Sequence, residues 1–146
     1  MRINAFADVC LRTLMLLGAQ AGDQLTSREI SERIGVPYNH VSKAVLELRR
    51  RGALEVARGR SGGARITASG LALGVGELLR SLDGHQDPVE CISADGTSCP
   101  LLAGCRLRSA LNQAREAFYA TLDDITIDSL TSSPSLARLP FPILPV

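Results

Sequence analysis

The sequence has little of what enzymes and membrane proteins require. It contains only two histidines, and no nucleophile motif or acid–base arrangement typical of catalysis is recognisable, so we do not expect an enzyme. No apolar run approaches the roughly 20 residues that a membrane-spanning helix needs. Because no signal peptide is recognisable either, we expect a soluble, cytoplasmic protein with no membrane partner, whose thiols stay reduced.

The net charge is close to zero, but the charged residues are unevenly distributed along the chain. The formal net charge of the 146 residues is +1, with twelve Lys and Arg against seven Asp and Glu in residues 1–82, and four against eight in residues 83–146. A basic N-terminal part is expected of a protein that binds a phosphate backbone, although a merely solvated surface accounts for it equally well. The length allows one domain, or a small domain plus a dimerisation element.

Apolar periodicity predicts three helices, at residues 3–20, 27–34 and 37–51. The second and third are short and joined by a turn containing Gly35, which is typical of a helix-turn-helix whose second helix enters the major groove by its N-terminal end. A helical hairpin with a polar outer face is the plainer alternative. The predicted DNA contacts of these helices are Arg28, Tyr38, Asn39, His40, Ser42 and Lys43.

Residues 54–66 predict a hairpin wing with a glycine-rich tip. Its arginines, Arg58, Arg60 and Arg65, suit the narrow minor groove of DNA. A nucleotide-phosphate loop is disfavoured because no Gly-Lys-Ser/Thr sequence and no strand-then-helix context accompany the glycines. A fourth helix is predicted at 71–82, weakened by two glycines, and we assign residues 1–82 to a winged helix-turn-helix DNA-binding domain.

Three of the four cysteines fall in one polar stretch, residues 88–107. They are Cys91, Cys99 and Cys105, and we assign residues 83–105 to a cluster-binding loop. Thiolates suit zinc and iron–sulfur clusters, and three of them leave a four-coordinate site one ligand short. Ordinary buried thiols, or a disulfide plus a spare, are disfavoured by the polar surroundings and the reducing compartment. Cys10 lies on the apolar stripe of the first helix and is expected in the core.

A long last helix is predicted at residues 106–124. Its apolar seam consists of Leu107, Leu111, Ala114, Phe118 and Leu122, and Arg108, Arg115 and Glu116 are expected on the solvent side. This seam is longer than a small winged domain covers, so we expect a homodimer. We assign residues 106–132 to this dimerisation helix and a short element at 125–130 that covers the seam. Residues 133–146 are expected to be a flexible Pro-rich tail.

Four stretches carry a resemblance to a known family. They read RINAFADVCLR at the start, VPYNHVSKA in the third helix, CPLLAGCRLR around the last two clustered cysteines and EAFYATLD in the last helix. With the order of the parts, they make residues 1–130 resemble the NsrR/IscR family of iron–sulfur transcription regulators. The chain is most similar to the family's actinobacterial nitric-oxide-sensing repressors.

The resemblance implies a mainly α, winged helix-turn-helix repressor that binds a double-stranded DNA operator as a homodimer and responds to nitric oxide. It further implies a [4Fe-4S] cluster held by the three clustered cysteines of one subunit and by Asp8 of the partner subunit, with Arg12 orienting or neutralising Asp8. IscR-type members use a histidine where this chain has Leu107. The seven-residue gap between the first two clustered cysteines is longer than usual for the family.

Two alternatives stay open at this point. One is a [2Fe-2S] redox or cluster-homeostasis regulator of the same family. The other is a structural zinc protein, in which His85 completes a tetrahedral site with the three cysteines.

Overall fold

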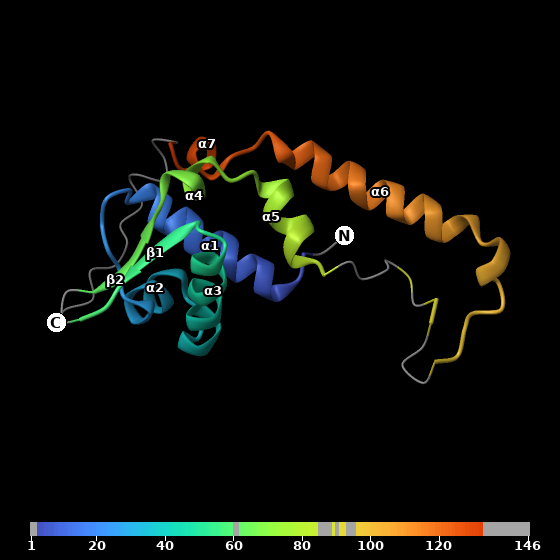
Figure 1. Ribbon diagram of the computed structural model, residues 1–146, viewed down its shortest axis with the longest axis horizontal. Helices are drawn as coiled ribbons and strands as arrows, with labels where there is room; N and C mark the ends of the chain where they lie inside the picture. Colours follow the sequence, from blue (N-terminus) through green and yellow to red (C-terminus); the bar gives the residue numbers. More distant parts are fainter. Residues whose placement is uncertain (1–2, 60–61, 85–88, 90, 93–95, 133–146) are drawn as a thin grey trace.

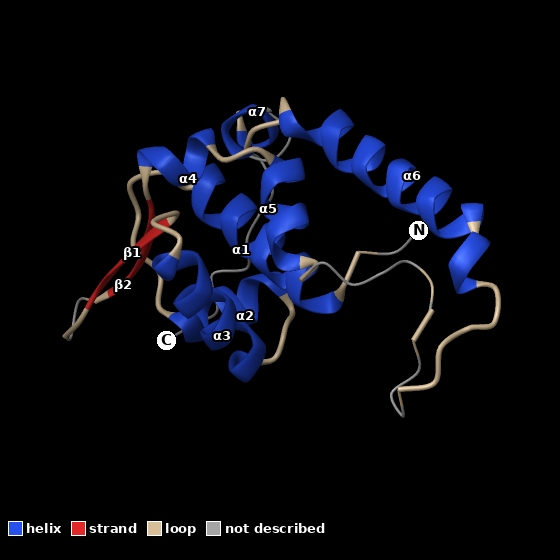
Figure 2. Cartoon of the chain, turned by 45° about the vertical axis from the view of Figure 1, so that its right-hand side comes forward, coloured by secondary structure: helices blue, strands red, loops and turns tan. Residues whose placement is uncertain are grey.

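The computed structural model describes residues 3–59, 62–84, 89, 91–92 and 96–132. They are mainly helical with one two-stranded sheet (Figure 1; Figure 2), as predicted. The elements are α1 (Ala5–Ala19), α2 (Ser27–Ile34), α3 (Tyr38–Arg50), β1 (Leu54–Ala57), β2 (Gly63–Ile66), α4 (Ala68–Ala72), α5 (Val75–Leu82), the 3-10 turn η1 (Leu102–Gly104), α6 (Arg106–Asp123) and α7 (Ile127–Thr131). None of the helices in these described ranges is both long and apolar enough to cross a membrane.

Helices α2 and α3 form the predicted helix-turn-helix, and local sequence signals set their ends. The Thr26 hydroxyl accepts a hydrogen bond from the backbone N–H of Glu29, and the Glu29 carboxylate accepts one from the N–H of Thr26 at 2.7 Å, which is a capping box. The bonds from Thr26 hold the pKa of Glu29 below its usual range. Gly35 closes α2 with a left-handed φ of 65°. Pro37 is the N-cap of α3 rather than its first helical residue, because its ψ of 137° is extended.

Helix α1 forms the centre of the core and packs against α2, α3, α5 and α7. All five of these helices contribute to the largest fully buried apolar side chains, which are Leu14, Leu17, Ile30, Val41, Leu48, Leu78 and Ile127. Complete burial of such a side chain stabilises the fold by about 1.5–3 kcal/mol. We call residues 3–82 together with α7 the winged body.

The predicted wing is present as an antiparallel pair running from Leu54 opposite Ile66 to Ala57 opposite Gly63. It is fixed to the chain before α2, because Leu25 donates its N–H to the Ala64 carbonyl at 3.0 Å and Ala64 donates its N–H to the Leu25 carbonyl at 2.7 Å. The segment before α2 therefore pairs with β2 and fixes the hairpin to the rest of the winged body.

The single helix predicted at 71–82 is wrong, because the chain forms α4 and α5 with a break at Leu73 and Gly74. Leu73 is extended, with a ψ of 126°, and its carbonyl accepts a hydrogen bond from the N–H of Ile127 at 3.1 Å. A Cβ atom on Gly74 would lie 2.4 Å from the carbonyl oxygen of Asp123. The glycine therefore allows the chain to pass close to the end of α6, at the cost of helix continuity.

Helix α6 packs along α5 and extends beyond the body, as Figure 1 shows. We call α6 and the described residues between 89 and 105 the arm. The short element after it is α7, which packs on α1 and α4. A Cβ atom on Gly18 of α1 would lie 2.9 Å from the Thr131 methyl group, so the two helices are in close contact. The prediction that this element also covers the seam of the last helix stays a prediction, because the main contacts of α7 are with α1 and α4.

Candidate nucleic-acid interface and metal centre

The N-terminal end of α3 presents a polar surface to solvent. Tyr38, Asn39, His40 and Lys43 are exposed there, whereas Val41 on the opposite face is fully buried. The free N–H groups of a helix N-terminus attract anions such as phosphate. The end of α3 can therefore combine backbone attraction for phosphate with side chains that reach base edges. The four side chains are therefore accessible, and their DNA contacts stay predictions.

Arg28 and Ser42 are placed differently. The guanidinium carbon of Arg28, on α2, lies 5.7 Å from the centroid of the Tyr38 ring, a cation–π contact that links the two helices at their exposed ends. Ser42 is half-buried, and its hydroxyl oxygen is enclosed with no hydrogen-bond partner among the described residues. A contact between Ser42 and DNA would require its side chain to turn outward.

The wing carries two of its three predicted arginines within the described residues. Arg58 is exposed where β1 ends. Arg65 lies opposite Glu55 in the sheet, and its Nη2 is 2.7 Å from the Glu55 carboxylate. An exposed pair of this kind is worth about 0–1 kcal/mol, so a phosphate can compete with Glu55 for Arg65. Arg60 lies outside the described residues.

Two of the three clustered cysteines lie directly opposite each other. Cys99 donates its N–H to the carbonyl of Cys91 at 2.9 Å, and Ile92 and Ser98 form an antiparallel bridge beside them. The turn η1 then leads to Cys105, which is the N-cap residue of α6. All three cysteines are free thiols; Cys91 is buried, and the other two are half-buried.

The donor chemistry of this segment fits a thiophilic metal or an iron–sulfur cluster. Cys105 also stands at the N-terminus of α6, where the chain turns from η1 into the helix. Within the described ranges, however, no group of three or more His, Cys, Asp and Glu side chains could hold a metal ion. The described part of one chain therefore provides donors but not a finished site. His85 lies outside the described residues.

Asp8 and Arg12 lie one turn apart on α1 and form an ion pair, with Arg12 Nη2 2.8 Å from Asp8 Oδ2. The Asp8 side chain is 39% exposed, so its carboxylate is accessible from outside the chain. Helix α1 belongs to the winged body, whereas the described stretch before α6 reaches outward from that body (Figure 1). The predicted contact between Arg12 and Asp8 is present, and their predicted roles at a metal stay predictions.

Cys10 is a core residue, as predicted. It is fully buried on α1. Burial, with a smaller contribution from the Glu47 carboxylate, raises the pKa of its thiol to about 12. A thiol with so high a pKa is a poor nucleophile and a poor metal ligand at neutral pH.

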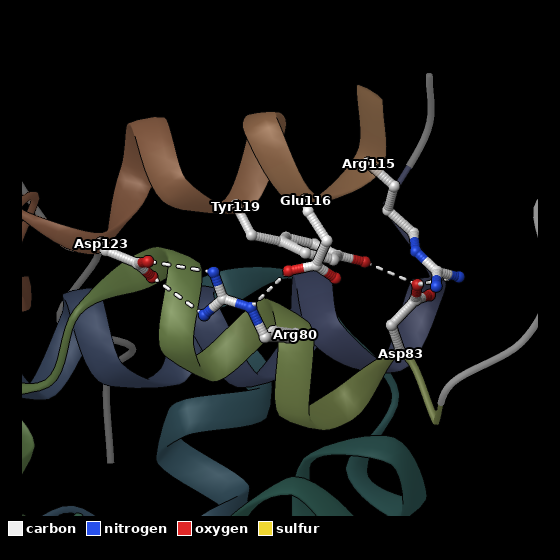
Figure 3. Close-up of polar contacts among 6 residues, drawn as sticks. All are labelled: Arg80, Asp83, Arg115, Glu116, Tyr119 and Asp123. Atoms are coloured by element: carbon white, nitrogen blue, oxygen red, sulfur yellow. Dashed lines mark hydrogen bonds and ion pairs between the residues drawn. The ribbon is translucent and has the colours of Figure 1, made fainter. Parts of the chain in front are cut away.

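A group of five charged residues and one tyrosine between α5 and α6 was not predicted from the sequence. We call it the α5–α6 clasp; it consists of Arg80, Asp83, Arg115, Glu116, Tyr119 and Asp123 (Figure 3). The expectation that Arg115 stays on the solvent side is wrong, since its side chain is 17% exposed and lies 3.9 Å from Asp83. Arg108 is likewise half-buried. Glu116 is exposed, as expected. The i, i+3, i+7 spacing of Glu116, Tyr119 and Asp123 is the signal that could have revealed a polar face turned toward α5.

Comparison with known proteins gives the family of the chain. The family model described as "Rrf2: Iron-dependent Transcriptional regulator" matches residues 3–133. The HTH-type transcriptional repressor NsrR of Streptomyces coelicolor is 44% identical over 137 residues, which cover 92% of this chain and 91% of that protein. The HTH-type transcriptional regulator NsrR of Geobacillus kaustophilus is 36% identical, covering 95% of this chain and 96% of that protein.

Solved structures of low sequence identity share the fold. CymR, the global cysteine regulator of B. subtilis, superposes with a TM-score of 0.67 at 22% identity, covering 90% of this chain and 97% of that chain. IscR of T. potens gives a TM-score of 0.65 at 18% identity, covering 89% and 85%. These likenesses support the winged helix-turn-helix with a long C-terminal helix. The chain therefore belongs to the Rrf2 family of iron-dependent transcriptional regulators, as an NsrR-type repressor and not an enzyme.

Proposed function

We propose that the chain acts in the cytoplasm as a homodimeric, nitric-oxide-sensitive repressor that carries a [4Fe-4S] cluster and binds a dyad-symmetric DNA operator. The observation that carries the proposal is the set of three free thiols outside the core, between α5 and the start of α6, in a member of a family of iron-dependent regulators. We assign DNA binding to residues 1–82, cluster binding to 83–105, dimerisation to 106–132 and a flexible tail to 133–146.

The proposed ligands are Cys91, Cys99 and Cys105 of one subunit and Asp8 of the partner subunit. The backbone bond between Cys91 and Cys99 supports this set, because it holds two of the sulfur-bearing residues side by side. The exposed part of the Asp8 carboxylate supports a role across an interface. Arg12 would hold that carboxylate in one orientation through its 2.8 Å ion pair.

When bound, the cluster would supply iron atoms that bind nitric oxide, and its oxygen-ligated corner would be the weakest, since such iron prefers sulfur. Release of Asp8 from the iron would leave its carboxylate paired only with Arg12. It would also free α1 of one subunit from the arm of the other. Helix α1 packs directly on α3, so a change at α1 would alter the separation of the two α3 helices. Half-sites on DNA lie about one helical turn, ~34 Å, apart, and a dimer with another separation binds them less well.

A gel-shift experiment tests this function. The probe is a dyad-symmetric DNA selected from a random library with anaerobically reconstituted protein. We expect nitric oxide to weaken binding by about tenfold or more, within the usual range of coupling between two sites. A double variant, Cys99→Ala with Cys105→Ala, is the control and should show no response. Unchanged affinity of the reconstituted wild-type protein after nitric oxide would reject the proposal.

Spectroscopy and metal analysis separate the two alternatives. About four irons and four sulfides per chain support the [4Fe-4S] cluster, whereas about two of each favour a [2Fe-2S] redox or cluster-homeostasis regulator. Zinc is kept as a second candidate because three thiolates leave a four-coordinate site one ligand short, and His85 is a histidine close to them in sequence. A colourless anaerobic preparation with stoichiometric zinc would favour that candidate.

The variant Asp8→Ala tests the role of the carboxylate. Three thiolates remain, so we expect the cluster absorbance to persist or to weaken modestly while the rate of reaction with nitric oxide changes. Absorption spectra recorded during anaerobic titration measure both. If the variant matches the wild type in spectrum, reactivity and DNA affinity, Asp8 is only a surface acid.

A further inference from the structure

Arg80 of α5 holds α6 through three hydrogen bonds. Its Nη1 and Nη2 donate to the two carboxylate oxygens of Asp123 at 3.1 and 3.0 Å, and its Nε donates to Glu116 at 3.1 Å (Figure 3). The guanidinium carbon also lies 5.4 Å from the ring centroid of Tyr119. A bidentate Arg–carboxylate pair fixes orientation as well as distance. Arg80 therefore restrains α6 over about two helical turns.

A second contact ties the start of the cysteine segment to the same helix. The Tyr119 hydroxyl donates to the carboxylate of Asp83 at 2.5 Å, and Asp83 is the C-cap residue of α5, where the chain leaves the body. Burial, together with the bond to Asp83, raises the pKa of Tyr119 to about 12, so the hydroxyl keeps its proton at neutral pH. The segment ends at Cys105, the N-cap residue of α6. Both ends of the cysteine segment are thus anchored on α6.

The backbones of α5 and α6 are in close contact beneath the clasp. A Cβ atom on Gly76 would lie 2.1 Å from the carbonyl oxygen of Tyr119. On its other side, α5 packs on α1, and Asn4 Nδ2 donates to the carbonyl of Leu82 at 3.4 Å. Helix α1 in turn packs on α3. A continuous path of packed elements therefore leads from Cys105 through α6, α5 and α1 to the predicted DNA-reading helix.

We propose that Arg80 is a positioning residue that couples the cysteine-bearing end of α6 to α3, by making α5 and α6 move as one rigid unit. The inference rests on the proposed function, because it takes the state of the cysteine site as input and DNA affinity as output. With the clasp closed, a displacement of α6 is carried by α5 to α1 and α3. With the clasp open, the joint between α5 and α6 absorbs the displacement, and DNA affinity no longer reports it.

The test uses the full-length homodimer with Arg80→Gln, which keeps a polar, unbranched side chain but removes the charge and the guanidinium fork. The quantity measured is the ratio of DNA affinities before and after nitric oxide, alongside iron content and absorption spectrum. We expect wild-type iron content and spectrum, with a ratio reduced about tenfold. Arg80→Lys, which keeps the charge, should restore part of the ratio. Glu77→Gln, an exposed position on the same helix, is the matched control and should leave the ratio unchanged.

A wild-type ratio in Arg80→Gln would overturn the inference. If that variant loses its iron or its fold, Asp123→Asn replaces it, since Arg80 then keeps its bond to Glu116; an undiminished ratio in Asp123→Asn would overturn the inference equally. Hydrogen exchange of the metal-free protein tests the rigid unit without any metal. Faster exchange of α6 amides in Arg80→Gln than in wild type supports the clasp, and equal exchange overturns it while the proposed function stands. A wild-type ratio of one rejects the proposed function, and the coupling role of Arg80 with it.

Discussion

The winged body and the arm differ in how completely each buries its own apolar side chains. In the body, Leu14, Leu48 and Ile127 are 0% exposed. In the arm, Leu101 is 72% exposed and Leu107 is 59% exposed. Clustered exposed apolar residues are typical of surfaces that bind a partner. The body is complete within one chain, and the arm has the character expected of an element completed by a second copy.

The α5–α6 clasp, which joins the winged body to the arm, differs from both regions. The body is held together by apolar contacts, which depend weakly on orientation, whereas the clasp consists of directional hydrogen bonds and ion pairs. Charged networks define geometry more sharply than they add stability. The molecule therefore combines a body with its own apolar core, an arm with exposed leucines, and a polar joint between α5 and α6.

The largest effect is expected from removing a thiol of the arm. In Cys105→Ala we expect loss of essentially all bound iron, because two sulfurs and one oxygen cannot hold the cluster, while the winged body keeps its fold. Iron analysis and circular dichroism measure the two effects. Cys10→Ala should do the reverse, keeping the iron and destabilising the body by about 1 kcal/mol. Iron retained by Cys105→Ala would contradict the proposed ligand set.

Two leucines of α3 test the completeness of the body. Leu48 is fully buried and Leu46 is 60% exposed on the same helix. We expect Leu48→Ala to lower the free energy of unfolding by about 2–5 kcal/mol, through lost burial and the cavity left behind. Leu46→Ala should change it by less than about 0.5 kcal/mol. Urea denaturation of the metal-free protein provides both values. Equal effects of the two substitutions would contradict the difference in burial between Leu48 and Leu46.

The seam of α6 tests the incompleteness of the arm. Burial of an exposed leucine in an interface contributes about 1.5–3 kcal/mol, so Leu107→Ala should weaken dimerisation by about tenfold or more. Gln113→Ala, at an exposed position on the other side of α6, should have little effect. Sedimentation equilibrium measures the dissociation constant. A dimer unaffected by Leu107→Ala would show that this end of the seam lies outside the interface.

The predicted DNA contacts of the body should differ in strength. Lys43 is exposed on α3, whereas Arg65 is already paired with Glu55. We expect Lys43→Ala to weaken binding of all sequences by a similar factor and to reduce the slope of log affinity against log salt by about 1. Arg65→Ala should have a smaller effect, because Arg65 must give up its ion pair with Glu55 in order to bind a phosphate. Fluorescence anisotropy at several salt concentrations tests this order, which a larger effect of Arg65→Ala would reverse.

The smallest effect is expected from acid acting on the clasp. The hydrogen bonds from Arg80 hold the pKa of Asp123 below its ordinary value of 3.8. A lowered pKa in the folded state means that this pair contributes stability above the ordinary pKa, and that the contribution is lost as the pH falls through the folded-state pKa. The difference in Tm between wild type and Asp123→Asn should therefore be constant near neutral pH and shrink below 3.8. A difference that grows on acidification would contradict this assignment.

Local signals predicted most of the body. The apolar spacing of α1 and α3, the Thr26–Glu29 cap and the glycine at the end of α2 act within a few residues, so sequence pattern suffices to find them. The hairpin wing is equally local, since its two strands are separated by a short glycine-rich tip.

Long-range contacts were not predictable in the same way. The break at Leu73 depends on a hydrogen bond from Ile127, more than fifty residues away in the chain. The inward position of Arg115 depends on Asp83, and the position of α7 depends on Gly18 of α1. For the candidate site, residue types and spacing indicated the three cysteines, whereas Asp8 came only from the family resemblance. The described residues of one chain hold no group of three or more such donors, so the proposed site depends on an assembly that one chain does not show.

A crystal structure of the anaerobically prepared, cluster-loaded homodimer tests the central claim most directly. The decisive quantity is the distance from the cluster iron that no cysteine binds to the Asp8 carboxylate of the partner subunit. We expect direct coordination by that carboxylate, with Arg12 still bound to it. An Asp8 carboxylate far from the metal, exposed to solvent in both subunits, would contradict it.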